Sequence, residues 1–201
     1  MRYSPGRLYL AFYKPFEVLC QFSPEKLPDG SVSDKITLAA FGFPPDVYPV
    51  GRLDYDSEGL LLLSDDGRLT TKLFKENHPR TYLAQVENIP CAESIAELEA
   101  GVIIEGKATL PCQAWLLPNE PTLPDRQKPV RFRKNIPTAW LELTLFEGRN
   151  RQVRKMTAKI GHPTLRLVRV AVGGLRLFEL GITAGQWVEL NREEFEAIFL
   201  D

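Results

Sequence analysis

The chain is poor in cysteine and histidine, the residues that build most disulfide frameworks and zinc sites. Its three cysteines, Cys20, Cys91 and Cys112, are odd in number and widely spaced, and its only histidines are His78 and His162. This pattern is typical of reduced cysteines that serve as small core residues, and it indicates a cytoplasmic protein rather than a disulfide-bonded secreted one. Without a paired cysteine motif, the sequence also gives little support for a zinc site.

Long apolar runs are missing as well. No segment approaches the length of a membrane span, and the first residues, Met-Arg-Tyr-Ser-Pro-Gly, lack the apolar region of a signal peptide. The sequence shows no internal repeat and no low-complexity tract. With 201 residues, 44% of them hydrophobic, it can form one globular unit or two small subdomains that share a core. We expect a monomer in the cytoplasm with no membrane partner.

The formal net charge of -1 hides an uneven distribution of charge. Residues 126–176 contain thirteen Lys or Arg and only two acids, Glu142 and Glu147, whereas residues 81–106 contain five Glu and no base. Phosphate binding depends on the local density of basic residues rather than on the net charge of the chain. This distribution therefore favours a nucleic acid as the partner. A solvated surface with accidental clustering would leave the same pattern.

The most informative stretch is residues 51–67, where a polar turn precedes a strongly apolar run. Four consecutive leucines at 60–63 lie between a glycine and Ser-Asp-Asp-Gly, which predicts a short buried strand. The turn at 52–59 carries Asp54, Asp56 and Glu58. Such a turn, fixed between two buried segments, can hold a carboxylate rigidly at a surface.

The acids of this turn have more than one interpretation. Asp54 alone is most simply a turn residue or a helix cap. Asp54, Asp56 and Glu58 together could bind Mg²⁺, as in a metal-dependent phosphohydrolase. Alternatively, Asp56 and Ser57 could close the turn through hydrogen bonds from side chain to backbone.

The rest of the chain mixes strands and helices without a regular strand–helix–strand rhythm. Further strands are predicted at residues 8–13, 81–87, 102–104, 108–117, 139–146, 164–172 and 186–190. Helices are predicted at 68–75, 93–100, 151–160 and 193–200, with a short one at 33–41, and Asp66 and Asn150 are the expected caps of the first and third. The proline-rich residues 118–129 form a loop. This order predicts an α+β fold with a largely antiparallel sheet.

Two of the predicted strands carry informative side chains. In residues 139–146, Leu141, Leu143 and Leu145 share one face, whereas Trp140 lies on the other. In residues 164–172, Arg169 falls on the apolar side and breaks the alternation. A β-bulge, or an arginine that faces a cleft, would explain this position.

The helix predicted at 151–160 begins among arginines. Arg149 and Arg151 lie where the helix dipole is already positive, which is unfavourable by up to ~1 kcal/mol for each cation. A phosphate or carboxylate at the helix start would explain them, and solvent-exposed arginines are the alternative. Arg154 lies between the apolar stripe and the basic face, a position that suits a side chain pointing into a cleft.

Three segments together resemble the pseudouridine synthases that modify ribosomal RNA. Residues 51–63, Gly-Arg-Leu-Asp-x-Asp-Ser-x-Gly-Leu-Leu-x-Leu, resemble their active-site motif. Lys14-Pro15 resembles the first motif, and residues 147–154, Glu-Gly-Arg-Asn-Arg-Gln-Val-Arg, resemble a later one. The resemblance extends from Lys14 to about Trp187 and is greatest to the short synthases of the large ribosomal subunit, although residues 64–66, Ser-Asp-Asp, depart from the usual Thr-Asn-Asp or Thr-Asn-Asn.

The resemblance implies a reaction and a set of roles. The bond from uracil N1 to ribose C1′ breaks, the base turns, and C5 bonds to C1′. Asp54 would be the catalytic residue, Arg154 the basic residue that pairs with it, and Tyr82 the aromatic that stacks on the uracil. Arg52 would extrude or hold the target nucleotide, which must leave the base stack. No cofactor or metal is expected, because the reaction is redox-neutral.

The resemblance also implies a domain plan and a partner. Residues 1–201 would form a single catalytic domain of two subdomains with an active-site cleft between them, and no separate N-terminal RNA-binding module is expected. The expected substrate is a uridine in large-subunit (23S) ribosomal RNA. The residues expected to bind this RNA are basic, namely Arg131, Arg133, Arg149, Arg151 and Lys155. A non-catalytic RNA-binding or ribosome-assembly protein on the same fold is the competing interpretation.

Overall fold

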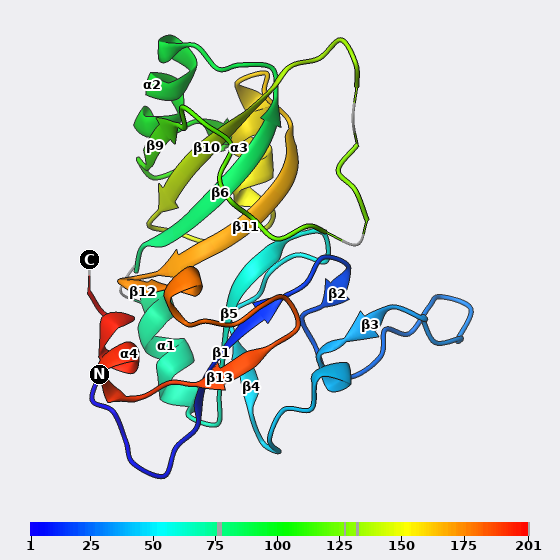
Figure 1. Cartoon of the computed structure of the whole chain (residues 1–201), viewed down its shortest axis with the longest axis vertical. Helices are drawn as coiled ribbons and strands as arrows, with labels where there is room; N and C mark the ends of the chain where they lie inside the picture. Colours follow the sequence, from blue (N-terminus) through cyan, green and yellow to red (C-terminus); the bar gives the residue numbers. More distant parts are fainter. Residues whose placement is uncertain (76–77, 127, 132, 201) are drawn as a thin grey trace. The chain divides into compact units, whose positions relative to one another are not determined.

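A computed structural model describes residues 1–75, 78–126, 128–131 and 133–200. The chain divides into two compact units, shown in Figure 1. Unit 1 comprises Met1–Glu76 and Gly173–Asp201, and unit 2 comprises Asn77–Val172. Strands form the centre of each unit and helices are few, so the α+β class predicted from the sequence is confirmed.

The sheet of unit 1 is antiparallel and is built around the leucine run. Its strand order is β13 (Trp187–Glu189), β1 (Tyr9–Lys14), β5 (Glu58–Ser64) and β4 (Tyr48–Val50). Every residue of β1 and β5 is buried, which confirms the strand predicted at residues 60–63. Burial of a leucine side chain stabilises a fold by roughly 1.5–3 kcal/mol. The two strands therefore give a stable support to the loop that precedes β5 and to the segment that follows β1.

The helices of unit 1 begin at side-chain caps. Helix α1 (Gly67–Lys75) starts after Asp66, whose carboxylate accepts a hydrogen bond from the backbone of Arg68, as predicted. Helix α4 (Arg192–Ala197) starts at Asn191 with a complete capping box. The short strand β12 (Leu175–Arg176) and the 3₁₀ helix η2 (Leu177–Glu179) precede it.

The short helix predicted at 33–41 is wrong over its first half. Residues Ile36–Thr37 form strand β3, which pairs in parallel with β2 (Val18–Leu19). Only Leu38–Phe41 are helical, as the 3₁₀ helix η1. The Thr37 side chain accepts from the backbone of Ala39, so the helical turn starts after Thr37.

The sheet of unit 2 is also antiparallel. Its strand order is β11 (Thr164–Val172), β6 (Arg80–Glu87), β10 (Thr138–Leu145) and β9 (Gln113–Leu116). The short strands β7 (Ile103–Ile104) and β8 (Lys107–Ala108) form a hairpin beside it. The strand predicted at 108–117 is therefore interrupted at residues 109–112, and residues 113–116 join the sheet as β9.

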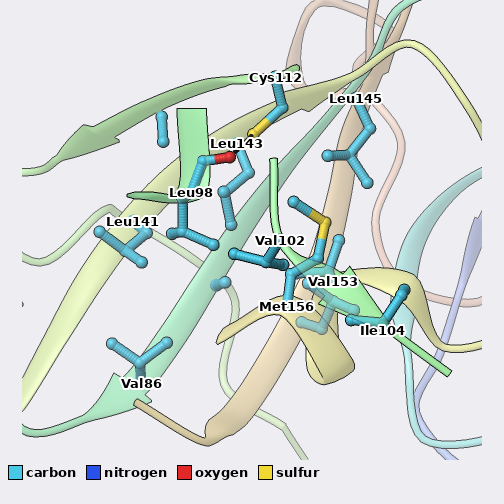
Figure 2. Packing of buried hydrophobic residues seen from close by; sticks show 13 residues of the cluster. Val86, Leu98, Val102, Ile104, Cys112, Leu141, Leu143, Leu145, Val153 and Met156 are labelled. Atoms are coloured by element: carbon cyan, nitrogen blue, oxygen red, sulfur yellow. Dashed lines mark hydrogen bonds between the residues drawn. The ribbon is translucent and has the colours of Figure 1, made fainter. Parts of the chain in front are cut away.

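Two helices pack on one face of this sheet. Helix α2 (Ala92–Ala100) contributes Leu98, and α3 (Gln152–Lys159) contributes Val153 and Met156 to an apolar cluster (Figure 2). The alternation predicted for β10 is confirmed, because its three leucines, Leu141, Leu143 and Leu145, join this cluster. On the opposite face lies a second buried cluster, made by Leu83, Trp140, Val168 and Val170.

The predicted cap of the third helix is wrong. Helix α3 begins one residue later than expected, and Arg151 occupies the cap position in the left-handed conformation, with φ 51° and ψ 36° and no side-chain cap bond. The Asn150 side chain instead accepts from the Lys155 ammonium at 3.3 Å. The left-handed residue redirects the chain into the helix, so the Asn150 side chain is not presented to the first free amides.

Strand β11 carries the irregularity that Arg169 suggested. Its pairing with β6 shifts register between Thr164 and Arg166 and again between Arg169 and Ala171. The predicted bulge is therefore confirmed, and Arg169 is buried opposite Tyr82. The pairing is regular from Arg166 to Arg169, so Arg169 lies on the same face as Leu167 and directly before the second bulge.

The cysteines are free, but they do not all lie in the core. Cys20 and Cys112 are buried, and burial raises the pKa of the Cys112 thiol to about 11. The Cys112 thiol donates to the Leu98 carbonyl at 3.2 Å, as the dashed line in Figure 2 shows. Cys91 is exposed, so its predicted core position is wrong. Within the described part of the chain, no helix is both long enough and apolar enough to span a bilayer.

Candidate active site

Asp54 lies in a loop of unit 1 whose backbone makes hydrogen bonds on both sides of this residue. The amide of Ser57 donates to the Asp54 carbonyl at 3.1 Å and closes a turn. The Tyr55 carbonyl accepts from the Glu17 amide at 2.9 Å, and the Leu53 amide donates to the Cys20 sulfur at 3.5 Å. The loop between β4 and β5 is therefore fixed on both sides of Asp54, as the sequence predicted for a rigid turn.

A lysine from β1 fixes the end of this loop. The Lys14 ammonium is fully buried and donates to the Ser57 carbonyl at 2.8 Å and to the Pro15 carbonyl at 3.0 Å. Burial disfavours its charged form and lowers the pKa of Lys14 to about 8, against the opposing effect of Cys20, Glu58, Asp56 and Asp54.

The side-chain bond predicted for Ser57 is wrong. The Ser57 hydroxyl is buried and has no hydrogen-bond partner among the residues that the structure describes. Its backbone makes the contacts instead, through the Asp54 carbonyl and the Lys14 ammonium. In the described ranges, no group of three or more His, Cys, Asp or Glu is arranged to hold a metal ion.

Tyr82 lies in the middle of the unit 2 sheet. It is half-buried, pairs with Leu143 of β10 and Arg169 of β11, and packs against the apolar cluster of Figure 2. Arg80 lies two residues before it on the same face of β6. Burial, helped by the nearby positive charge of Arg169, lowers the pKa of Arg80, while Tyr82 opposes that shift. Arg80 and Arg169 therefore place positive charge close to Tyr82.

Arg154 is held at the junction of α3 and β11. Its guanidinium donates to the Thr164 carbonyl at 3.2 Å. The Thr157 hydroxyl lies 2.7 Å from the Thr164 hydroxyl and donates to the Arg154 carbonyl at 3.3 Å. Arg154 is half-buried between the apolar stripe of α3 and its exposed face, which is the border position that the sequence predicted.

Arg149 makes several contacts within unit 2 that the sequence did not reveal. Its guanidinium contacts the Glu147 carboxylate at 3.0 Å and donates to the carbonyls of Lys107 and Ala108. The Glu147 carboxylate also accepts from the backbone of Leu110 and from Gln152. These bonds tie the start of α3 to the segment that follows β7.

The other basic candidates differ in their surroundings. Lys155 contacts Glu105 at 2.7 Å, and Arg133 contacts Glu87 at 3.2 Å. Arg52, Arg131 and Arg151 are exposed. Asp54 and Arg52 belong to unit 1, whereas the remaining candidates belong to unit 2.

The chain matches a known family over most of its length. Residues 8–159 match the model of the RNA pseudouridylate synthase family. The chain is 55% identical over 166 residues to ribosomal large subunit pseudouridine synthase E of Xanthomonas axonopodis, covering 82% of this chain and 85% of that protein. It is 46% identical over 188 residues to the protein of the same name from Vibrio parahaemolyticus, covering 92% of this chain and 75% of that protein.

The fold has a solved counterpart. A crystal structure of a pseudouridylate synthase superimposes with a TM-score of 0.74 at 24% sequence identity, covering 96% of this chain and 74% of that one. This likeness shows the pseudouridine synthase fold. Together with the match over residues 8–159, it establishes that the chain belongs to the RNA pseudouridylate synthase family.

Proposed function

We propose that this protein converts a specific uridine of large-subunit (23S) ribosomal RNA into pseudouridine. The observation that carries the proposal is Asp54, which occupies the aspartate position of the family motif on a loop fixed by backbone contacts on both sides. The names of the Xanthomonas and Vibrio relatives supply the RNA class. Such a substrate is consistent with a cytoplasmic protein, and we propose that it acts as a monomer.

The proposed reaction depends on a rigidly held carboxylate rather than on a cofactor. The isomerisation breaks one glycosidic bond and forms another without a change in redox state. We assign Asp54 the role of nucleophile or base in that exchange. We propose Arg154 as the basic residue that acts with Asp54, which is the role that the family motif implies for its last arginine.

Tyr82 and Arg52 handle the target nucleotide in this proposal. A half-buried tyrosine presents an aromatic face on which an extruded uracil can stack. We assign Arg52, which is exposed two residues before Asp54, the role of holding the displaced nucleotide. We propose that units 1 and 2 serve this reaction as one catalytic domain.

The RNA-binding residues fall into two groups. Arg131 and Arg133 are exposed on the loop before β10, and Arg151 and Lys155 lie at the start of α3. We propose that both groups contact phosphates. For Lys155 and Arg133, an RNA phosphate would have to compete with Glu105 and Glu87. Arg149 supports the same surface through its bonds to Glu147 and to backbone carbonyls.

Release of tritium from C5-labelled uridine in large-subunit RNA tests the proposal, because C5 loses its hydrogen when it bonds to C1′. The wild-type chain should release tritium, and Asp54→Asn should lower the rate at least ~100-fold with nearly unchanged RNA affinity. Asp46→Asn is the matched control, since Asp46 is exposed outside the motif and adopts a left-handed conformation that asparagine tolerates. Residual activity within about tenfold of wild type in Asp54→Asn would refute the assignment of Asp54.

A further inference from the structure

The acids of residues 81–106 have no part in the reaction proposed above. This segment contains five Glu and no Lys or Arg, and two of its acids contact cations that are proposed to bind RNA. Glu105 contacts the Lys155 ammonium at 2.7 Å, and Glu87 contacts the Arg133 guanidinium at 3.2 Å. Both pairs lie within unit 2. The segment therefore presents carboxylates of the protein itself to side chains that are expected to contact phosphates.

The position of Glu105 is fixed by the turn that carries it. Glu105 and Gly106 join β7 to β8 with φ 51° and 77°, the left-handed pair that is typical of a two-residue hairpin turn. Ile104, the residue before, is buried in the same apolar cluster as Val153 of α3 (Figure 2). The hairpin is thus anchored on the helix that carries Lys155.

The hairpin does not depend on the ion pair for its place. The Arg149 guanidinium donates to the carbonyls of Lys107 and Ala108 and holds the second strand of the hairpin. The side chain of Glu105 is 70% exposed, whereas that of Lys155 is 26% exposed. Glu105 can therefore turn into solvent while the hairpin and Lys155 stay in place.

We propose that Glu105 is an internal competitor of RNA, whose carboxylate occupies Lys155 until a phosphate displaces it. The inference rests on the proposed contact between Lys155 and RNA. An ammonium binds carboxylate and phosphate oxygens through the same charge-assisted hydrogen bonds, so the two anions compete for it. The displaced carboxylate remains on the neighbouring turn and repels the phosphate. Glu105 therefore weakens RNA binding and favours release of the modified RNA.

The expected effect is moderate because the ion pair is partly exposed. Exposed ion pairs change an equilibrium constant by up to about fivefold, so loss of the Glu105 charge should tighten RNA binding about two- to fivefold. Each additional phosphate that the protein neutralises steepens the dependence of log affinity on log salt by roughly 0.7–0.9. The salt dependence should therefore become steeper by up to this amount when Lys155 is released from Glu105.

Filter binding of a transcript of large-subunit RNA, measured between about 50 and 200 mM salt, tests this inference. Glu105→Gln keeps the shape of the side chain without its charge, and it should bind the transcript more tightly and with a steeper salt dependence. Glu97→Gln on α2 is the matched control, because Glu97 is an exposed acid of the same segment with no ion pair among the described residues. It should change the affinity by less than about 1.5-fold. Equal gains in the two variants would overturn the inference.

A double variant tests whether Lys155 is the point of competition. Lys155→Gln alone should weaken binding, and Glu105→Gln added to it should change the affinity no further. A gain from Glu105→Gln that persists without the ammonium would reflect net charge alone and would overturn the inference. Wild-type affinity in Lys155→Gln would overturn it as well.

Tritium release by the wild-type chain separates this inference from the proposed function. Release of tritium together with unchanged RNA affinity in Glu105→Gln would refute the competition and leave the proposed function standing. Conversely, binding of the transcript without tritium release would refute the proposed function. In that case, tighter binding by Glu105→Gln that requires Lys155 would still support the competition.

Discussion

Replacement of Asp66 by asparagine should destabilise the protein in a pH-dependent way. The Asp66 carboxylate is 4% exposed and accepts hydrogen bonds from the Arg68 guanidinium at 2.7 and 2.8 Å, from the Arg68 amide at 3.1 Å, and from the Tyr9 hydroxyl at 3.0 Å. Asparagine keeps the size and the ability to cap a helix, but it removes the negative charge.

The magnitude follows from the titration of Asp66. The bonds from Arg68 lower the pKa of Asp66 from 3.8 to about 2. Because the folded-state pKa is depressed, its stabilising contribution is fully present above pH ~4 and is lost as the pH falls through ~2. At ~1.4 kcal/mol per pKa unit, the charged group contributes about 2 kcal/mol at neutral pH.

Urea unfolding followed by circular dichroism measures this contribution. At pH 7, Asp66→Asn should lower the free energy of unfolding by about 2 kcal/mol relative to wild type, and the difference should shrink toward zero near pH 2. Asp46→Asn, an exposed change of the same chemistry, should cost less than ~0.5 kcal/mol at either pH. A loss in Asp66→Asn that is equally large at pH 7 and pH 2.5 would show that the charge is not its source.

Two further predictions concern RNA binding and backbone geometry. Neutralising Arg131, Arg133 and Lys134 together should weaken RNA binding and lower the slope of log affinity against log salt by roughly 0.7–0.9 for each phosphate that the variant no longer neutralises, whereas Arg192→Gln on α4 should leave the slope unchanged. Fluorescence titration across salt decides this, and equal slopes for the triple variant and wild type would mean that the loop is merely solvated. Gly173→Ala should destabilise the fold severely, by more than ~3 kcal/mol, because φ is +56° and the new Cβ would lie 2.0 Å from the Ile198 carbonyl oxygen. Gly161→Ala, at φ +84° with open space around it, should cost only about 1 kcal/mol from backbone strain, so equal losses at the two glycines in urea unfolding would contradict the steric argument.

The sheets could be predicted from the sequence because their signals are local. Four leucines bounded by polar residues identify a buried strand, and alternation at 139–146 assigns Leu143 and Trp140 to opposite faces, as the two apolar clusters confirm. The break at Arg169 allowed either a bulge or an arginine that faces a cleft, and the register of β11 shows the bulge. In each case the deciding contacts repeat with the period of the strand itself.

The parts that failed depend on partners far away in the sequence. The bond from Lys14 to Ser57 spans 43 residues, and the bond from Arg149 to Ala108 spans 41, so no periodic pattern contains them. The expected Asn150 cap and the expected Ser57 side-chain bond were reasonable from local turn chemistry. At Ser57 the backbone carbonyl accepts from Lys14 while the hydroxyl has no partner in the described chain, and the chain enters α3 through a left-handed Arg151 instead of a cap at Asn150.

The most direct test is a map of pseudouridines in ribosomal RNA from cells that lack this protein. One site in the large-subunit RNA should lose its pseudouridine and regain it when the wild-type gene is supplied. Asp54→Asn, expressed to the same level, should not restore the site, whereas the Asp46→Asn control should restore it fully. An unchanged map in cells without the protein, or full restoration by Asp54→Asn, would contradict the proposal that Asp54 makes this chain a pseudouridine synthase of large-subunit ribosomal RNA.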